Sequence, residues 1–481
     1  MKQMSLFDYI LEPKRIEKKI RIIELFAGIG SQLKALRQIT DNVEHYKICE
    51  WAYPSICAYN AIHIKDFTHY SAGMSKDELI HAVEGISVNY NTALTLEQLS
   101  RKPINWLRNA YDNIRATNNL VDIMRVHGKD LEIRERERYE YILTYSFPCQ
   151  DLSLAGRLGG MSKSQAEGGT RSGLLWEVER ILGELGQDEL PQILLMENVP
   201  QILNKKNLPD FHKWQNRLEE LGYKNYVEVL NARDFGIPQN RKRCFMISIL
   251  GDYSYDWPEP FELKYRLKDF LDSEVDKKYF LSEKMLRYIV STNDKYSGSQ
   301  QPAKVNKTIA SCITTKVERR CDVSTYIAPE LPDEIDLRDK IAIKNATKQG
   351  YLIAEEGDGI DIAQRSGHRG TVQKGTAQTL KTEIDVGVAV IEEKKLLVRK
   401  LTPRECYKLM GFERKDHDAV EAYGQPDGQR YHEAGDSIVV TVLMAIFNQL
   451  LGEENYREKV TKYTAKLVEQ VGGTVKRSGT G

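Results

Sequence analysis

The chain has 481 residues, 41% hydrophobic and 29% charged, and its 69 basic side chains balance 69 acidic ones. This length can bury a large core in two or more domains, and zero net charge gives no global sign of a polyanion partner. The seven cysteines form no CxxC pair, which argues for a reducing compartment and against a zinc ribbon. Neither a signal-peptide core nor an apolar run of about 18 residues is present, so we expect a cytoplasmic protein with no membrane partner and no metal.

A glycine turn follows the first strand pattern. The apolar run at 20–26 leads into Gly28 and Gly30 and then into a helical stretch at 31–39. Backbone amides of such a turn can approach a polar cofactor closely, and Phe26 can offer an aromatic face to a purine. A tight turn between a strand and a helix that binds no cofactor would have the same sequence pattern.

A second strand, 45–51, ends in Glu50 and Trp51. An acidic residue at this place in a βαβ unit usually binds a ribose hydroxyl, and Trp51 can stack on a base. The acid and the two glycines together favour a cofactor site over a plain turn.

The next hundred residues are mostly polar. We interpret the stretch from about 65 to 119 as an insertion at the sheet's edge, with helical patterns at 75–83 and 96–116. Residues 120–123 suggest a short strand whose Asp122 points toward the same crevice. An acidic residue in an exposed loop would have the same sequence pattern. The alternating charges of 132–140 indicate a solvated helix face.

Ser146 to Gln150 (SFPCQ) follow a buried strand pattern at 141–145. A thiol at the end of a parallel strand is well placed to reach a substrate, so Cys149 is a candidate nucleophile. The alternative is that Cys149 is a small buried hydrophobe, which is the commoner fate of a free cysteine. The glycine-rich stretch 151–170 has the composition of a mobile lid.

Two further groups follow the next strands. A helix is predicted at 171–185 and a buried strand at 192–199, where burial would raise the pKa of Glu197 toward neutrality and suit proton exchange. A helix cap is the structural alternative for Glu197. Arg241, Lys242 and Arg243 precede a strand at 244–250 and can hold an anion or orient a carbonyl, although solvated charges look similar.

These patterns define the expected domains. Residues 1–252 form a catalytic and cofactor-binding α/β domain with a doubly wound, mostly parallel sheet, and 253–395 form a smaller, irregular, β-rich domain. Residues 396–470 return to the first domain with helices at 401–412 and 439–451, and 471–481 are an expected disordered tail.

Taken together, eight motifs resemble the bacterial DNA cytosine-5 methyltransferases, and among them the type that includes CpG-specific enzymes of wall-less bacteria. In the family's order they are FAGIG at 26–30, EW at 50–51, SFPCQ at 146–150, GTRSGLLWE at 169–177, ENV at 197–199, QNRKR at 239–243, LTPRE at 401–405 and GDSI at 435–438. The resemblance covers nearly the whole chain.

The resemblance implies S-adenosyl-L-methionine as methyl donor and a Rossmann-like fold with a target-recognition domain. It places these residues at the donor: Phe26, Gly28, Ile29, Gly30, Glu50, Trp51, Asp122, Ile123, Pro148, Leu174, Asp436, Ser437 and Ile438. Asp436 departs from the asparagine that the family most often carries, and an aspartate cannot donate an amide hydrogen.

The resemblance also implies catalytic roles for Cys149, Glu197, Arg241 and Arg243, with Arg241 at the cytosine O2 and Arg243 beside the active-site acid. Expected contacts to double-stranded DNA, with the target base flipped out, are made by Gln150, Ser153, Arg171, Gln239, Thr314, Thr315, Lys316, Arg319, Arg320, Arg365 and Arg369. A monomer is expected, and a separately encoded restriction endonuclease is a compatible partner. Two alternatives are a tRNA cytosine-5 methyltransferase and a DNA-binding module that has lost catalysis.

Overall fold

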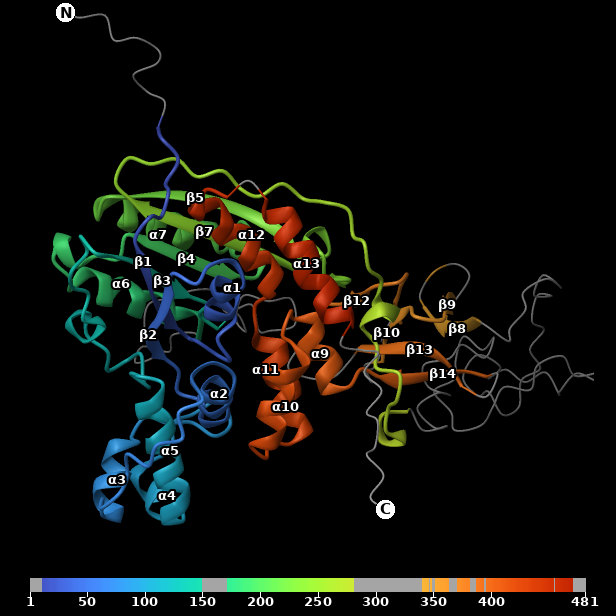
Figure 1. The fold of residues 1–481 in the computed structure, drawn as a ribbon, viewed down its shortest axis with the longest axis horizontal. Coiled ribbons are helices and arrows are strands. Elements are labelled where there is room, and N and C mark those ends of the chain that lie inside the picture. Colours follow the sequence, from blue (N-terminus) through green and yellow to red (C-terminus); the bar gives the residue numbers. More distant parts are fainter. Residues whose placement is uncertain are drawn as a thin grey trace, which may run out of the picture.

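A six-stranded sheet forms the centre of the molecule in the computed structural model (Figure 1). The structure describes residues 11–148, 171–280, 340–345, 347, 351–362, 370–380, 386–392, 395–453 and 455–469. The sheet has the order β2-β1-β3-β4-β7-β5, in which β2, β1, β3 and β4 are parallel and β7 is antiparallel to both neighbours. Its strands are β1 Lys19–Leu25, β2 Val43–Cys49, β3 Tyr139–Tyr145, β4 Ile193–Asn198, β5 Tyr223–Asn231 and β7 Lys242–Leu250.

Helices cover both faces of this sheet. In β4, Ile193 and Leu195 pack with one helical layer, whereas Leu194 and Met196 pack with the other. The first layer consists of α1 Ser31–Ile39, α12 Val440–Leu451 and α13 Tyr456–Glu469, and the second of α6 Leu175–Gly183 and α7 Leu208–Glu220. Both faces of the central strand β4 are buried and its sequence is mostly apolar, whereas the edge strands β2 and β5 carry more polar residues. The predicted α/β fold with a mostly parallel sheet is confirmed.

Two predictions for the stretch between 120 and 140 were wrong. The expected strand at 120–123 is a turn, with Val121 at φ 63° and a single bridge from Asn119 to Ile48. The Asn119 side chain accepts bonds from the backbone amides of Glu50 and Val121, which holds the turn. The expected helix over 132–140 is also absent from this described stretch, because the backbone turns at Glu132 and β3 begins at Tyr139.

The polar insertion is a separate bundle of helices with its own apolar core, at the lower left of Figure 1. Its helices are α3 Lys76–Ala82, α4 Leu96–Ser100 and α5 Ile104–Ala116, and they join the sheet through α2 Tyr53–Tyr59. The helix expected at 96–116 is broken at Pro103, which precedes α5. Proline lacks the amide hydrogen that a continuous helix needs.

Short strands and three further helices complete the described structure. A four-stranded sheet has the order β11-β10-β13-β14, β8 pairs with β9, and β12 pairs with β6. Their bounds are β6 Gln239–Asn240, β8 Lys340–Lys344, β9 Tyr351–Glu355, β10 Gly359–Asp361, β11 Val372–Gln373, β12 Ala377–Gln378, β13 Val386–Glu392 and β14 Lys395–Lys400. The helices are α9 Pro403–Leu409, α10 Arg414–Ala422 and α11 Asp427–Asp436. Single turns lie at Asn60–Ile64, Gly128–Leu131, Arg171–Leu174, Gln187–Glu189, Pro200–Leu203, Ala232–Phe235, Leu267–Phe270 and Lys277–Tyr279.

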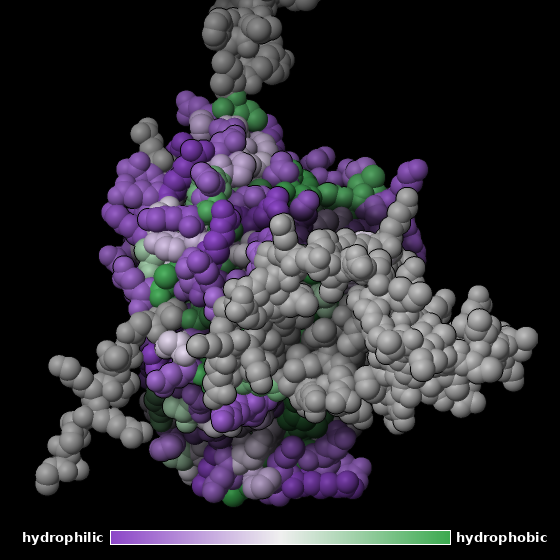
Figure 2. Space-filling model, turned by 90° about the vertical axis from the view of Figure 1, so that its right-hand side faces the viewer, coloured by the Kyte–Doolittle hydropathy of each residue, from purple (hydrophilic) through white to green (hydrophobic). Residues whose placement is uncertain are grey.

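One segment, Asp427–Leu451, is long and apolar enough to cross a membrane, but 83% of its most apolar window is buried inside the protein. It comprises α11 and α12, and α12 packs on the central sheet with α1. Burial of this kind is expected of a core helix. The described surface that faces the viewer in Figure 2 is mostly hydrophilic, with scattered hydrophobic side chains.

Candidate active site

The candidate site lies where the sheet changes direction. Strand β1 pairs with β2 on one side and with β3 on the other, so the connections to these two strands run to opposite sides of β1. Such a reversal of strand order leaves a crevice at the carboxyl ends of β1 and β3. The ends of three strands are bonded there. The amide of Phe26 donates to the carbonyl of Cys49 at 2.8 Å, and the Ser146 hydroxyl donates to the carbonyl of Phe26 at 3.4 Å.

A buried carboxylate, Glu50, sits at this crevice beside the glycine turn. Its Oε2 accepts the amide of Gly28 at 2.9 Å and its Oε1 accepts the amide of Ala52 at 2.7 Å. Burial raises the pKa of Glu50, and these two amide bonds oppose the rise. The turn has positive φ at Phe26, Gly28 and Gly30, and an added Cβ at Gly28 would meet nothing within 4 Å. The acid and the turn predicted from the sequence are therefore in contact, with open space beside them.

Phe26, Trp51 and Asp122 are the other predicted cofactor residues near Glu50. Phe26 packs against the core on the α6 and α7 side, and Trp51 packs against the core of the insertion. The Asp122 carboxylate accepts the amide of Met124 at 3.0 Å and lies 3.5 Å from the Arg125 guanidinium. Ile123 is buried in the same core that Phe26 packs against. Contacts of these residues to a cofactor stay predictions.

Glu197 and Arg243 form a second charged pair, at the end of β4. Arg243 Nε lies 3.0 Å from Glu197 Oε1, because β7 runs antiparallel beside β4. Burial raises the pKa of Glu197, as the sequence predicted, while Arg243 and Arg241 oppose the rise. A carboxyl whose pKa is raised holds its proton to a higher pH than an exposed one, which suits it to act as a proton donor.

Asn198 is a site residue that the sequence analysis did not single out. Its side-chain amide donates to the carbonyl of Phe147 at 3.0 Å, and its oxygen accepts the amide of Val199 at 2.8 Å. Asn198 thereby fixes the segment that runs into Pro148 next to Glu197. Its position after Glu197 in the ENV motif was the available signal.

Arg241 has a different environment from the one expected. Its Nη1 donates to the carbonyl of Leu380 at 2.8 Å, and its Nη2 donates to the carbonyls of Gly435 and Ser437 at 3.0 and 2.8 Å. Both terminal nitrogens of this buried side chain are thus bonded to backbone. Arg241 therefore joins the segment of Leu380 to the segment of Gly435 and Ser437. Its contact to a cytosine O2 stays a prediction.

The segment from Gly435 to Ile438 closes the crevice from the C-terminal side. The amide of Ile438 donates to the hydroxyl of Ser31 at 3.2 Å, which joins this segment to the start of α1 beside Gly30 and Ile29. The Asp436 carboxylate lies 3.1 Å from Nε2 of His432. Leu174 lies at the start of α6, packed against the same core as Phe26.

Of the expected DNA contacts, Gln239 is fully buried. Its Nε2 donates to the carbonyl of Leu409 at 2.8 Å and its Oε1 accepts the amide of Leu380 at 3.0 Å. Both polar groups of the Gln239 side chain are therefore bonded within the protein, and its contact to DNA stays a prediction. Arg171 opens the turn Arg171–Leu174. The other predicted residues lie outside the described residues: Cys149, Gln150, Ser153, Thr314, Thr315, Lys316, Arg319, Arg320, Arg365 and Arg369, as does the expected lid at 151–170.

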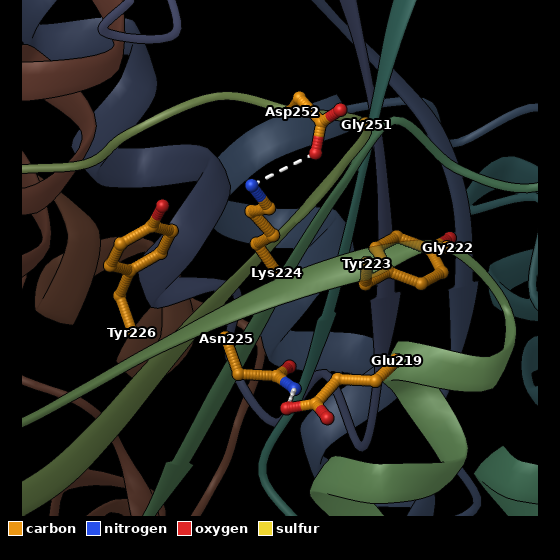
Figure 3. Close-up of a pocket in the computed structure, with 8 residues that line it drawn as sticks. All are labelled: Glu219, Gly222, Tyr223, Lys224, Asn225, Tyr226, Gly251 and Asp252. Carbon is orange, nitrogen blue, oxygen red and sulfur yellow. Dashed lines mark hydrogen bonds and ion pairs between the residues drawn. The ribbon is translucent and has the colours of Figure 1, made fainter. Parts of the chain in front are cut away.

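Two other features lie apart from this crevice. A hollow of about 670 Å³ lies between the start of β5 and the end of β7, lined by Tyr223, Lys224 and Asp252 among others (Figure 3). Tyr223 pairs with Leu250 at the end of β7, and β7 is antiparallel to β4, so this hollow is at the opposite edge of the sheet. His417 and Glu421, two of a three-residue group with metal-ligand geometry, both bond the Arg430 guanidinium.

A crevice at the topological switch point, with a buried acid at the end of β2 and a carboxylate–guanidinium pair at the end of β4, defines an α/β enzyme that binds a nucleotide-like cofactor. The family model for C-5 cytosine-specific DNA methylases matches residues 74–452, and the chain belongs to this family. The protein is accordingly an S-adenosylmethionine-dependent DNA (cytosine-5) methyltransferase.

Relatives of known sequence agree with this family. The chain is 38% identical over 280 residues to the orphan methyltransferase M.SssI of Spiroplasma monobiae, covering 56% of this chain and 69% of that protein. It is 28% identical over 436 residues to the type II methyltransferase M2.ScrFI of Lactococcus lactis subsp. cremoris, covering 90% and 99%. Among solved structures, the Dnmt2 methyltransferase of S. pombe matches with a TM-score of 0.49 and 17% identity, covering 91% of this chain and 99% of that chain.

Proposed function

We propose that this enzyme methylates C5 of a cytosine in duplex DNA after its Cys149 thiolate adds to C6 of the flipped-out base. The observation that carries the proposal is the pair of Glu197 and Arg243, 3.0 Å apart, next to the segment that leads through Phe147 and Pro148 to Cys149. The bond from Asn198 to the Phe147 carbonyl joins the acid's strand to the strand of the nucleophile. An acid and a nucleophile on adjacent strand ends can act on one ring together.

The crevice residues fit the methyl donor. The Glu50 carboxylate is fixed by two backbone amides and is an acceptor suited to ribose hydroxyls, and open space lies beside Gly28. When bound there, S-adenosylmethionine supplies an electrophilic methyl group. Pro148 and Leu174, and the segment from Asp436 to Ile438, are proposed to line the rest of the pocket.

The chain's own groups account for the remaining chemistry. The C5 atom of cytosine is too weak a nucleophile to be methylated unaided, so addition of the Cys149 thiolate at C6 first breaks the ring's conjugation. Glu197 gives a proton or hydrogen bond to N3, which places electron density on C5. After the methyl group has transferred to C5, water accepts the C5 proton, the Cys149 sulfur leaves C6 as a thiolate and N3 returns its proton to Glu197, which restores the aromatic ring. Arg243 holds Glu197 in position throughout.

Duplex DNA is the proposed substrate rather than transfer RNA. The predicted recognition domain at 253–395 is long, and relatives that act on transfer RNA have a short one. Base flipping follows from the chemistry, because C6 is hidden within a stacked duplex. We propose a monomer acting in the cytoplasm, and a restriction endonuclease partner is compatible with the relative M2.ScrFI, which is named a type II methyltransferase.

Methyl incorporation into duplex DNA and into transfer RNA by the purified protein tests the proposal, with bisulfite sequencing to locate the modified cytosines. We expect incorporation into DNA alone, and abolition of incorporation in Cys149→Ser. A Cys149→Ser protein that methylates at the wild-type rate would refute the role of the thiol. Methylation of transfer RNA alone would establish the alternative substrate, and an inert wild-type protein that still binds DNA would establish the non-catalytic alternative.

A further inference from the structure

Tyr90 lies at the tip of the loop between α3 and α4 of the insertion. Its φ of 61° is uncommon for a bulky side chain, and such a conformation persists only where the surroundings fix it. The Asn89 side chain does so, because its oxygen accepts the amides of Asn91 and Thr92 at 3.0 and 3.1 Å. The loop is therefore held in one shape, with Tyr90 projecting from it.

This loop is bonded directly to the segment after Glu50. The amide of Ser87 donates to the carbonyl of Trp51 at 2.7 Å, and the amide of Tyr53 donates to the carbonyl of Ser87 at 2.8 Å. Ser87 also pairs with Ala52 as a parallel bridge. The insertion thus extends the wall of the crevice at the residue next to its buried acid.

The Tyr90 ring reaches the opposite wall. It stacks on His432 with ring centroids 3.8 Å apart and the planes tilted by 40°. His432 in turn pairs with Asp436, at 3.1 Å. A chain of contacts therefore joins the insertion to the segment Gly435 to Ile438, which closes the crevice from the C-terminal side.

The Tyr90 hydroxyl is buried and makes no hydrogen bond of full geometry with the described residues, although it lies near the side chain of Ser55. Burial raises the pKa of Tyr90, and the carboxylates of Glu433, Glu50 and Asp436 act in the same direction. The hydroxyl therefore keeps its proton and is available as a donor. Buried hydroxyls usually have a partner, so this one is suited to an acceptor that enters the crevice.

We propose that Tyr90 is a further binding residue for the methyl donor, supplied by the insertion. Its ring, backed by His432, closes the crevice beside Glu50, and its hydroxyl donates a hydrogen bond to an oxygen of S-adenosylmethionine. This inference rests on the proposed function, because it requires the donor to occupy this crevice.

The competing explanation is that Tyr90 only docks the insertion on the C-terminal helices. A second contact provides the matched control. The Tyr423 hydroxyl bonds the Asn113 and Asn109 side chains at 2.6 and 3.0 Å, which also joins these helices to the insertion. If docking alone matters, loss of the Tyr423 hydroxyl should have the same effect on donor affinity as loss of the Tyr90 hydroxyl.

Calorimetric titration of the full chain with S-adenosylmethionine and with S-adenosylhomocysteine, without DNA, tests the inference. We expect Tyr90→Phe to raise Kd by about 2- to 10-fold, the range for one hydrogen bond, and Tyr90→Ala to raise it further. Tyr423→Phe should leave Kd within about 2-fold. In steady-state methylation, Tyr90→Phe should raise KM for the donor with kcat unchanged.

Wild-type Kd in both Tyr90 variants would overturn the inference, and so would an equal rise in Tyr423→Phe. Neither outcome touches the proposed function, which Cys149→Ser tests separately. A wild-type chain that binds neither compound would overturn both. Thermal unfolding without ligand shows whether a variant is destabilised globally. If Tyr90→Ala is destabilised, the Kd of Tyr90→Phe, which keeps the ring, is used to test the inference.

Discussion

The guanidinium of Arg243 lies 3.0 Å from the carboxylate of Glu197, and both groups stand at the edge of the sheet where β3 ends. Burial of Glu197 favours its protonated form, and Arg243 favours its ionised form. The balance between them sets the pH at which Glu197 can give a proton to a base. Two predictions follow from this pair.

Replacing Glu197 by glutamine should lower the single-turnover methylation rate by about 10²-fold or more, the scale for a positioned acid. Glutamine keeps the size of the side chain but cannot transfer a proton. Rapid-quench measurement with saturating donor and DNA gives this rate. Donor affinity should not change, and a near-normal rate would remove Glu197 from the chemistry.

Replacing Arg243 by methionine should raise the pKa of Glu197, because the arginine's charge lowers it. If the rate requires protonated Glu197, the limb of the pH profile that falls as pH rises should move to higher pH. Single-turnover rates between about pH 6 and 9 measure this limb. The neighbouring exposed Lys242, changed to methionine, is the control and should leave the profile in place. An unmoved limb in the Arg243 variant would show that another group sets it.

Replacing Asn198 by alanine removes the donor to the Phe147 carbonyl and should cost about 1–3 kcal/mol of folding stability, since that carbonyl is left buried without its partner. We also expect kcat to fall, because the segment leading to Cys149 loses its anchor. Urea unfolding and steady-state kinetics measure the two effects. Asn225 is the control, because it lies on β5 away from the crevice and its side chain donates to the Gln215 carbonyl of α7. Its alanine variant should lose stability and keep kcat.

The stability contributed by Glu433 and Glu24 should fall as pH rises from about 4.5 to 8. Burial raises the pKa of Glu433 to about 8 and that of Glu24 to about 7, from an ordinary value of 4.5. The unfolded chain loses these protons first, so the folded state binds more protons across this window and is destabilised as pH increases. Glu433→Gln should flatten the slope of urea midpoint against pH, particularly between about pH 6 and 8.

Glu413 provides a control of opposite sign. Burial would raise the pKa of Glu413, but Lys34 and its other cationic neighbours lower it to about 2. The stability that it contributes is present above pH 4.5 and is lost only as pH falls toward 2. Glu413→Gln should therefore lower the urea midpoint by the same amount at every pH from about 5 to 9. An unchanged slope in Glu433→Gln would show that Glu433 ionises normally.

Local sequence signals predicted the parts of the site that depend on strand ends. The glycine turn, Glu50 after β2 and Glu197 after β4 follow from apolar runs that stop at polar residues, and parallel strands bring such ends to one edge. The pairing of Glu197 with Arg243 was stated from the family resemblance. What the resemblance could not give was the environment of Gln239 and Arg241, which depends on segments more than 130 residues away.

The errors have local and long-range causes. The strand expected at 120–123 failed because the Asn119 side chain bonds the backbone and competes with sheet pairing. Tyr90 was overlooked because nothing in its neighbourhood of the sequence marks it. Its importance comes from a stack on His432, 342 positions later, that only a three-dimensional arrangement reveals.

The bond from Ile438 to the Ser31 hydroxyl spans 407 positions and has a consequence for how the enzyme is made. Helix α1 leaves the ribosome before α12, which packs beside it on the same face of the sheet and is made only after all six strands of that sheet. Until then the apolar face of α1 lacks its cover and the crevice lacks its C-terminal wall. A nascent chain that ends before α12 therefore has an incomplete crevice and an exposed apolar face, and both are completed only when α12 has been made.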